Sequence, residues 1–156
     1  MDWWKQIFEA FKVADIRQVA YVPDAGHSDL IRRCDGADDM RLVPLTTEEE
    51  GVGLLAGAHL GGSRGVLLMQ SSGAGNCINL LSLTRAGRFP FLTLISMRGD
   101  FGEGNPWQIP MGQSTQPVLE ACDVTCLRID SPAEVTTTID AALTMAFQNE
   151  MPIAVL

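Results

Sequence analysis

The stretch Gly65-Val66-Leu67-Leu68-Met69-Gln70-Ser71-Ser72-Gly73-Ala74-Gly75-Asn76 decides the fold class of this chain. Its apolar part, Val66 to Met69, is uninterrupted, which is typical of a strand that is covered on both faces of a sheet. A glycine-rich turn follows at residues 71–76, and we expect it to open a helix that runs to about Arg85. A buried strand that leads through glycines into a helix predicts one unit of a parallel α/β sheet.

The same alternation of strand and helix runs along the whole sequence. Together with Val66–Met69, five more apolar runs predict strands at Val19–Val22, Arg41–Leu45, Phe91–Ile95, Val124–Ile129 and Pro152–Leu156. Apolar spacing and capping residues predict further helices at about residues 3–17, 28–33, 47–60, 117–121 and 132–148. The four glycines and two prolines of residues 98–113 predict an irregular loop. The expected fold is a three-layer αβα domain with a six-stranded, mainly parallel sheet.

Length, charge and cysteine pattern limit the classes of function. The chain has 156 residues, which is about one domain, and we expect a single domain over residues 1–156. Its 11 Lys and Arg against 19 Asp and Glu give a net charge of −8, which argues against nucleic-acid or anionic-membrane binding. We expect a cytoplasmic protein, because the sequence shows no membrane-spanning stretch and no signal-peptide pattern. Four cysteines without a C-x-x-C pair, and only two histidines, argue against a structural zinc site.

The residues that could carry chemistry follow the predicted strands. In an open parallel sheet, ligands bind beyond the carboxyl ends of the strands. The loops expected there contain His27, the run Glu48-Glu49-Glu50, the glycine-rich turn and the long loop from Met97 to Gln113. The glycine-rich turn could bind an anion through its N–H groups, or could be a tight connection that needs glycine. The glutamates could satisfy the dipole of a helix N-terminus, or could act in catalysis.

Several of these segments together resemble a known family. Residues 49–59, 65–69, 71–76 and Asn79, in this order and spacing, are similar to the pyrimidine-binding (PYR) domain of thiamine-diphosphate enzymes. Val22-Pro23-Asp24, and Met97-Arg98-Gly99 leading to Gly112-Gln113, resemble the branch that contains the sulfopyruvate decarboxylase α subunit and phosphonopyruvate decarboxylase. The resemblance covers nearly the whole chain. It implies a decarboxylase of a small 2-oxo acid with an anionic 3-substituent, with sulfopyruvate as the first choice and sulfoacetaldehyde and CO₂ as products.

The resemblance also implies roles for residues around the cofactor. Aligning the Gly-Ala-His end of the helix makes Glu49 the glutamate that hydrogen-bonds the aminopyrimidine, with Glu48 and Glu50 as alternatives. Such a carboxyl shares a proton with a ring nitrogen, and burial, which raises a carboxyl pKa, makes this sharing possible near neutral pH. Thiamine diphosphate would supply the carbon nucleophile and hold the electrons after CO₂ leaves. The turn that we expect to flank the aminopyrimidine consists of Ser72, Gly73, Ala74, Gly75 and Asn76.

Three further residues are candidates for contact with the substrate. His27 matches a position where related decarboxylases place a polar group, and we expect it to be catalytic; a surface-loop histidine is the alternative. Arg98 could attract an anionic tail or could form a loop salt bridge. Gln113 is the third candidate. Trp107, in the long loop, could belong to a lid or to a partner contact.

The diphosphate half of the family's site is missing from this sequence. The family motif that binds Mg²⁺ and diphosphate begins Gly-Asp-Gly and ends at an Asn, whereas Gly99-Asp100-Phe101-Gly102 has Phe at the third position, so we expect no metal ligand here. We therefore expect a β subunit with a Gly-Asp-Gly…Asn motif to hold Mg²⁺, unless the chain is a fragment of a fused enzyme. Carboligation of the acetolactate-synthase type, a phosphonopyruvate substrate, and a non-catalytic regulatory or binding module remain open.

Overall fold

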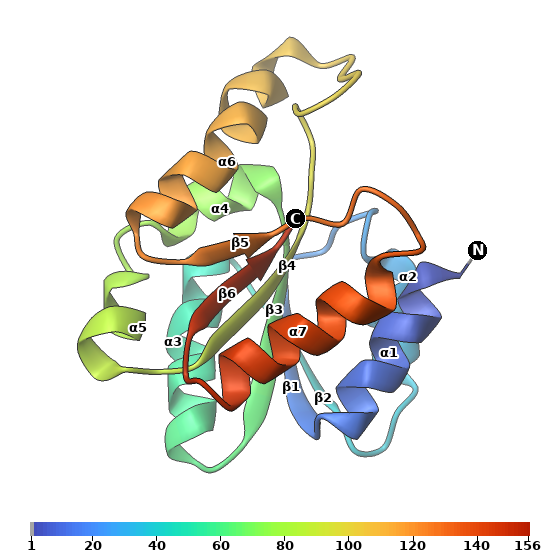
Figure 1. Ribbon diagram of the computed structural model, residues 1–156, viewed down its shortest axis with the longest axis vertical. Coiled ribbons are helices and arrows are strands. Elements are labelled where there is room, and N and C mark those ends of the chain that lie inside the picture. The colour runs from blue at the N-terminus through green and yellow to red at the C-terminus, as the bar shows by residue number, and fades with distance from the viewer. Residues whose placement is uncertain (1) are drawn as a thin grey trace.

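The computed structural model describes residues 2–156 as three layers built around one sheet (Figure 1). All six strands are parallel, in the spatial order β2-β1-β3-β4-β6-β5. Their bounds are β1 Ile16–Tyr21, β2 Arg41–Pro44, β3 Arg64–Gln70, β4 Phe91–Ser96, β5 Thr125–Leu127 and β6 Pro152–Val155. The predicted αβα architecture with a six-stranded parallel sheet is confirmed.

Helices cover both faces of the sheet. One face carries α1 Trp3–Val13, α2 Ser28–Asp35 and α7 Val135–Phe147, and α1 packs beside α7 (Figure 1). The other face carries α3 Glu48–Leu60, α4 Ser71–Cys77, α5 Ser82–Gly87 and α6 Ile109–Ala121. Side chains of β3 alternate between the two cores: Val66 and Leu68 pack toward α1 and α7, whereas Leu67 and Met69 pack toward α3 and α4. This double burial explains why the strand is apolar at every position.

The glycine-rich segment after β3 is helical, so the predicted turn at residues 71–76 is wrong. Ser71 is already the first residue of α4, and the predicted continuous helix to Arg85 is divided into α4 and α5. Between them the backbone hydrogen bonds tighten to three-residue spacing, for example from Ser82 N to Asn79 O. Tertiary packing against α3 and α6 thus outweighs the poor helix propensity of the two glycines in α4.

The second difference is at α6. Residues 109–113, predicted to be irregular, form its first turns after the 3₁₀ helix η1 Pro106–Gln108, and the predicted short helix at 117–121 is only its end. Pro110 fits because the first turn of a helix needs no N–H donor. Gly112 fits because a Cβ there would lie 2.1 Å from the carbonyl oxygen of Arg98. Glycine at position 112 therefore allows close packing and does not form a turn.

Smaller differences are found at other boundaries. Helix α1 ends at Val13 rather than near residue 17, and β1 begins at Ile16 rather than Val19. Asp15, between them, has φ of 58°, a left-handed conformation that stops the helix. β5 is confined to residues 125–127. α7 begins at Val135 rather than Pro132, after turns in which the Glu134 side chain accepts the N–H groups of residues 130 and 131.

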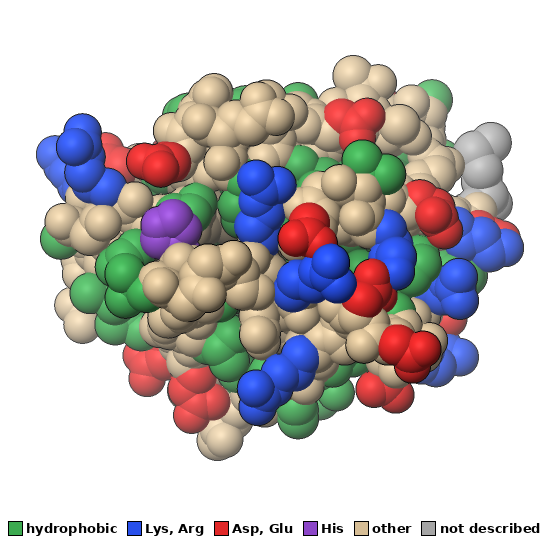
Figure 2. Space-filling model, turned by 90° about the horizontal axis from the view of Figure 1, so that it is seen from below, with side chains coloured by type: hydrophobic (Ala, Val, Ile, Leu, Met, Phe, Trp, Pro, Cys, Tyr) green, Lys and Arg blue, Asp and Glu red, His purple; other side chains and the backbone are tan. Residues whose placement is uncertain are grey.

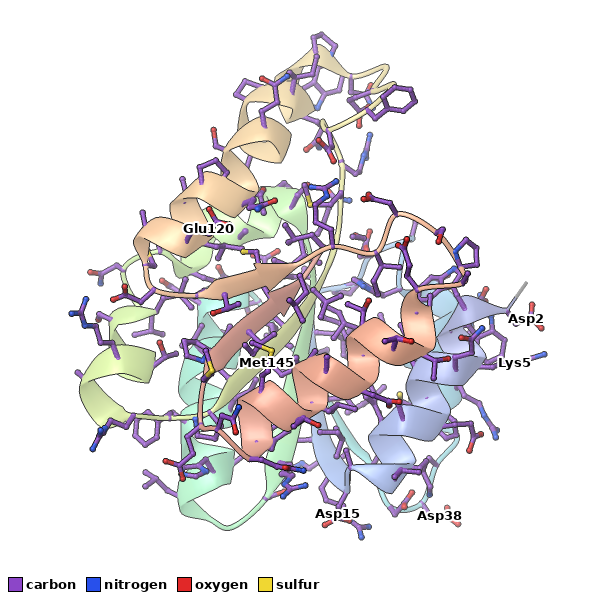
Figure 3. All side chains as sticks on the ribbon, viewed as in Figure 1. Asp2, Lys5, Asp15, Asp38, Glu120 and Met145 are labelled. Carbon is purple, nitrogen blue, oxygen red and sulfur yellow. The ribbon has the colours of Figure 1, made fainter. Side chains whose placement is uncertain are left out.

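Charged side chains lie at the periphery of the layers. Figure 3 shows Asp2, Lys5, Asp15, Asp38 and Glu120 pointing away from the core. Seen from below, acidic and basic side chains are intermixed on the surface (Figure 2). Over the described residues, every helix is too short or too polar to cross a lipid bilayer.

Candidate active site

The three consecutive glutamates at the start of α3 have three different surroundings. All lie in the first turn, where the helix dipole favours negative charge. Glu50 Oε2 accepts a hydrogen bond at 2.9 Å from Thr46 N, in the segment just before the helix. Glu48 is buried, with 8% of its surface exposed. Glu49 is exposed and forms no hydrogen bond or ion pair with any residue from 2 to 156.

Glu48 faces α4. Its Oε2 accepts a hydrogen bond from Asn76 Nδ2 at 2.8 Å. A Cβ on Gly73 would lie 2.2 Å from Glu48 Oε1, so only glycine leaves room for this carboxyl group. The missing side chain of Gly73 therefore provides the space for Glu48, a reason that the sequence pattern alone did not reveal.

The five predicted cofactor-binding residues of α4 are divided between the core and the surface. Gly73 and Ala74 are buried, whereas Ser72, Gly75 and Asn76 are exposed at the same edge as Glu49. A Cβ on Gly75 would meet only the Sδ of Met111 in α6, at 3.2 Å. A ligand that approaches from solvent would therefore reach the exposed members of the set.

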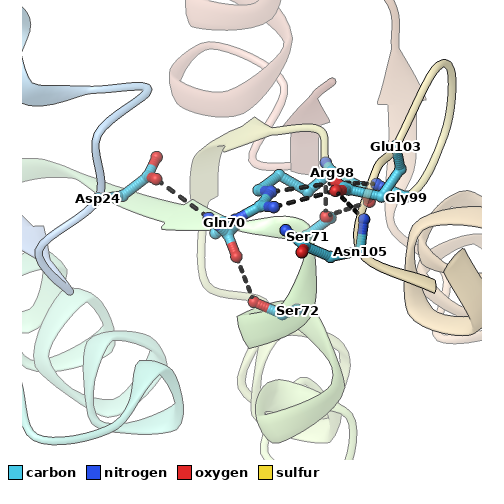
Figure 4. Close-up of polar contacts among 8 residues, drawn as sticks. All are labelled: Asp24, Gln70, Ser71, Ser72, Arg98, Gly99, Glu103 and Asn105. Carbon is cyan, nitrogen blue, oxygen red and sulfur yellow. Dashed lines mark hydrogen bonds and ion pairs between the residues drawn. The ribbon is translucent and has the colours of Figure 1, made fainter. Parts of the chain in front are cut away.

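A buried carboxylate joins the ends of three strands. Asp24, in the loop after β1, accepts a hydrogen bond on Oδ1 from Gln70 Nε2 at 3.2 Å and one on Oδ2 from Ser96 Oγ. Gln70 in turn accepts a hydrogen bond from Ser72 Oγ at 2.8 Å (Figure 4). Burial alone would raise the pKa of Asp24, but its contacts with His27 and Ser96 outweigh burial and hold this pKa well below its ordinary range.

Sequence reasoning gave no functional role to Asp24, Gln70 or Ser96. A signal was nevertheless available, because Gln70 and Ser96 are the last residues of β3 and β4 and Asp24 follows β1 closely. Polar groups at the carboxyl ends of adjacent parallel strands meet at one edge of the sheet. Their convergence follows from the strand order β1-β3-β4.

His27 is buried, so it is not the surface-loop histidine that the sequence left as an alternative. Only 4% of it is exposed, and its Nδ1 lies 3.3 Å from Asp24 Oδ2 without hydrogen-bond geometry. It lines a pocket of about 360 Å³ whose other walls are mainly apolar residues of α1, β4, β6 and α7. This is the face of the sheet opposite α3 and α4. Among the described residues, Asp24 and Gln70 connect His27 to Ser72 of α4.

Arg98 forms the loop salt bridge that the sequence left as one of two possibilities. Its Nε and one terminal nitrogen lie 3.2 and 3.1 Å from the carboxylate of Glu103. Glu103 also accepts the N–H groups of Gly99 and Asn105 (Figure 4). The hydrogen bond from Arg98, followed by that from Asn105 N, lowers the pKa of Glu103 to about 2. The start of the long loop is thus tied down by one carboxylate.

The remaining predicted residues lie on the surface. Gln113 is exposed on α6. In the loop before it, Trp107 is 72% exposed and Phe101 99%. Asp100, from the segment that resembles a metal motif only superficially, pairs with Arg128 at 2.6 Å. No three His, Cys, Asp or Glu side chains of the described chain come together in a way that could hold a metal ion.

Comparison with known proteins gives relatives along nearly the whole chain. It is 36% identical over 151 residues to "Sulfopyruvate decarboxylase subunit alpha" of Methanococcus maripaludis, covering 96% of this chain and 90% of that protein. The protein of the same name from Methanocaldococcus jannaschii is 35% identical, with 96% and 89% covered. Phosphonopyruvate decarboxylase of Streptomyces viridochromogenes is 34% identical over 140 residues, but this chain spans only 35% of its length.

No protein-family model matches the chain. Among solved structures, 2-oxoglutarate:ferredoxin oxidoreductase from Magnetococcus marinus superposes with a TM-score of 0.77 at 12% identity, over 100% of this chain and 28% of that one. This likeness shows a shared fold. Because the two methanogen proteins match at more than a third identity over about nine-tenths of their length, the chain belongs to the family of sulfopyruvate decarboxylase alpha subunits.

Proposed function

We propose that this chain is the alpha subunit of a thiamine-diphosphate-dependent decarboxylase that converts sulfopyruvate to sulfoacetaldehyde and CO₂. The relatives support the choice of substrate. Three proteins named as sulfopyruvate decarboxylase alpha subunits match this chain over 89–92% of their own length. The phosphonopyruvate decarboxylases match over 140 residues of this chain, against 151 for those three, at 34% and 31% identity.

The free carboxylate of Glu49 is the observation that carries the proposal. Its two neighbours are already bound, Glu48 to Asn76 and Glu50 to Thr46, whereas Glu49 faces outward with no partner among residues 2–156. One turn further along α3, Gly53 is exposed and a Cβ there would meet nothing within 4 Å. A flat ring can therefore approach the start of α3 closely beside Glu49.

These residues fit one half of a thiamine diphosphate site. When bound, the cofactor supplies the carbon nucleophile for the 2-oxo acid and takes up the electrons that CO₂ leaves behind. Glu49 would share a proton with a ring nitrogen of the aminopyrimidine. Ser72, Gly75 and Asn76 would flank the same ring, because they are the exposed members of α4.

We propose that a second chain supplies the diphosphate half of the site. A diphosphate with Mg²⁺ needs carboxylate or carbonyl ligands and compensating positive charge. Arg98, the cation predicted for this site, is already paired with Glu103, and the described residues offer no metal cluster. We therefore propose that residues 1–156 form a pyrimidine-binding domain and that a β subunit with a Gly-Asp-Gly…Asn motif holds Mg²⁺ and the diphosphate.

The buried position of His27 changes the role that we propose for it. A side chain that is 4% exposed and set against Asp24 has little access to a substrate at the α3–α4 edge. We therefore propose that His27 stabilises the Asp24 carboxylate. Arg98 would have to leave Glu103 before it could bind an anionic tail, so the partner subunit or Gln113 is the better source of substrate contacts.

The test is Glu49→Gln in the complex with the β subunit. Gln keeps the shape of the side chain but cannot hold the shared proton, so we expect the kcat for sulfopyruvate decarboxylation to fall by about 100-fold or more. Glu50→Gln is the matched control, because its amide oxygen can still accept the Thr46 N–H, and it should stay near wild type. If Glu49→Gln keeps its activity and Glu48→Gln loses it, the role belongs to Glu48.

A further inference from the structure

A chain of polar contacts leads from the buried Asp24 to the surface of α4. Asp24 Oδ1 accepts a hydrogen bond from Gln70 Nε2 at 3.2 Å, and Gln70 Oε1 accepts one from Ser72 Oγ at 2.8 Å (Figure 4). Asp24 is nearly closed to solvent, with 6% of its side chain exposed, whereas Ser72 is exposed. This series of hydrogen bonds therefore connects the buried edge of the sheet with the surface that a ligand would meet.

The buried carboxylate of Asp24 fixes the direction of both hydrogen bonds in this series. An ionised carboxylate can only accept hydrogen bonds. Gln70 must therefore turn its NH₂ group toward Asp24, which leaves its carbonyl oxygen toward Ser72. That oxygen can only accept, so the single hydroxyl proton of Ser72 is directed at Gln70. The lone pairs of Ser72 Oγ are what remain for a ligand.

A second buried carboxylate does the same one turn further along α4. Glu48 Oε2 accepts a hydrogen bond from Asn76 Nδ2 at 2.8 Å, which turns the amide oxygen of Asn76 away from Glu48. Residues 72 and 76 are four apart in a helix and lie on the same side of it. Both residues are exposed, so each can offer an acceptor oxygen to a ligand on this side of α4.

We propose that the exposed side of α4 selects a ligand edge that donates hydrogen bonds, with Ser72 Oγ accepting an N–H of an exocyclic amino group. Asp24 and Gln70 are positioning residues that set this polarity from within the protein. The inference rests on the proposed function, in which the amino-bearing ligand at this edge is the aminopyrimidine of thiamine diphosphate. A carbonyl group in the same place would face lone pairs and would be rejected.

Asp24→Asn should reverse the polarity without a change of shape. Ser96 Oγ donates to Asp24 Oδ2. When it goes on donating to the oxygen of the new amide, the NH₂ group of that amide faces Gln70. Gln70 then turns over and donates to Ser72 Oγ. The hydroxyl proton of Ser72 becomes free to point outward, toward a carbonyl. Ser72→Ala, by contrast, removes the acceptor and adds no donor.

The experiment compares two probes on the complex of this chain with its β subunit. Isothermal titration gives the Kd of thiamine diphosphate and of its 4′-oxo analogue, in which a carbonyl replaces the amino group. In the wild type we expect a clear preference for the amino compound. Ser72→Ala should lower this preference by about five- to tenfold, the weight of one ordinary hydrogen bond, by weakening the amino compound. Asp24→Asn should lower it as well and should bind the 4′-oxo compound more tightly than the wild type does.

Ser82→Ala is the matched control, because Ser82 is an exposed helical serine without a side-chain hydrogen bond among the described residues. It should keep the wild-type preference. If thiamine diphosphate binds and both test variants keep that preference, the inference is wrong while the proposed function stands. A wild-type complex that binds neither probe overturns both. Ser72→Ala changes only a surface hydroxyl, so the inference remains testable if Asp24→Asn does not fold.

Discussion

Gly73→Ala is the change whose cost follows most directly from the packing of α3 against α4. The added Cβ would lie 2.2 Å from Oε1 of Glu48 and 2.3 Å from its Cδ, so the carboxyl group must leave its position. With it goes the hydrogen bond that Asn76 Nδ2 donates to Glu48 at 2.8 Å. In the variant, a single added methyl group would therefore separate a buried carboxylate from its amide partner.

The magnitude combines three effects. A hydrogen bond to a charged group contributes about 1.5–3 kcal/mol. Overpacking at a tight contact costs roughly 1–3 kcal/mol. In the opposite direction, Ala is favoured over Gly inside a helix by about 1 kcal/mol. We therefore expect Gly73→Ala to lower the free energy of unfolding by about 1.5–5 kcal/mol, which corresponds to a drop in Tm of about 4–15 °C for a chain of this size.

Urea denaturation of the purified protein, followed by circular dichroism, measures the change. Gly75→Ala is the matched control in the same helix, because its Cβ would meet only the flexible Sδ of Met111, at 3.2 Å. Gly53→Ala, in open space on α3, is the second control. Both should be neutral or stabilising by up to about 1 kcal/mol. In the double variant Glu48→Ala/Gly73→Ala, the two costs should not add, because the first change removes the group with which the second collides.

Equal stability of Gly73→Ala and the wild type would refute the reasoning. So would an equal loss in Gly75→Ala, because the cost would then come from the backbone of α4 rather than from Glu48. An additive double variant would show that Glu48 and Gly73 do not compete for the same space.

Two further predictions follow from the titratable groups. Arg98 and the Asn105 N–H lower the pKa of Glu103 from 4.5 to about 2 in the folded chain. The contribution of Glu103 to the order of the 98–105 loop is therefore complete above about pH 4.5 and is lost as the pH falls toward 2. Trp107 fluorescence should report this change, and Glu103→Gln should abolish the pH dependence; an unchanged titration would exclude Glu103 as its source. Burial raises the pKa of Cys34 and of Cys77 to about 12, so iodoacetamide at pH 8 should leave both unmodified in the folded chain and label them in urea. Mass spectrometry distinguishes the four cysteines, and rapid labelling of either buried thiol in the folded chain would contradict the burial.

The fold could be predicted from the sequence because its strands are apolar on both faces. Periodicity fails where glycine serves packing instead of backbone freedom. Gly73 and Gly112 both lie inside helices and both face a group that leaves no space for a Cβ. Their partners, Glu48 and Arg98, are 25 and 14 residues away, so a window that reads local patterns interprets both glycines as helix breakers. Glycines that serve close packing therefore contribute to the errors at both α4 and α6.

The meeting of the candidate-site loops at one edge of the sheet was predictable, but the hydrogen bonds among their side chains were not. The order of strands alone brings the loops after β1, β3 and β4 to one edge, and the chemistry of those loops is visible in the sequence. Which polar group bonds with which depends on packing that no motif encodes. Asp24 receives hydrogen bonds from the ends of two other strands, and Arg98 is bound by a glutamate five residues later. A free cation and a paired one look the same in a sequence.

The run Glu48-Glu49-Glu50 shows how three identical side chains take three roles. Successive residues of a helix point about 100° apart, so neighbours cannot share one environment. Glu48 points at α4 and is bound by Asn76. Glu50 points back at Thr46 and accepts its N–H, and Glu49 is left exposed. The hydrogen bonds of Glu48 and Glu50 hold the start of α3 in position. This gives the Glu49 carboxyl a defined place at the edge of the sheet. A catalytic carboxyl needs such a frame more than it needs a partner of its own, because the group that it must meet arrives with the ligand.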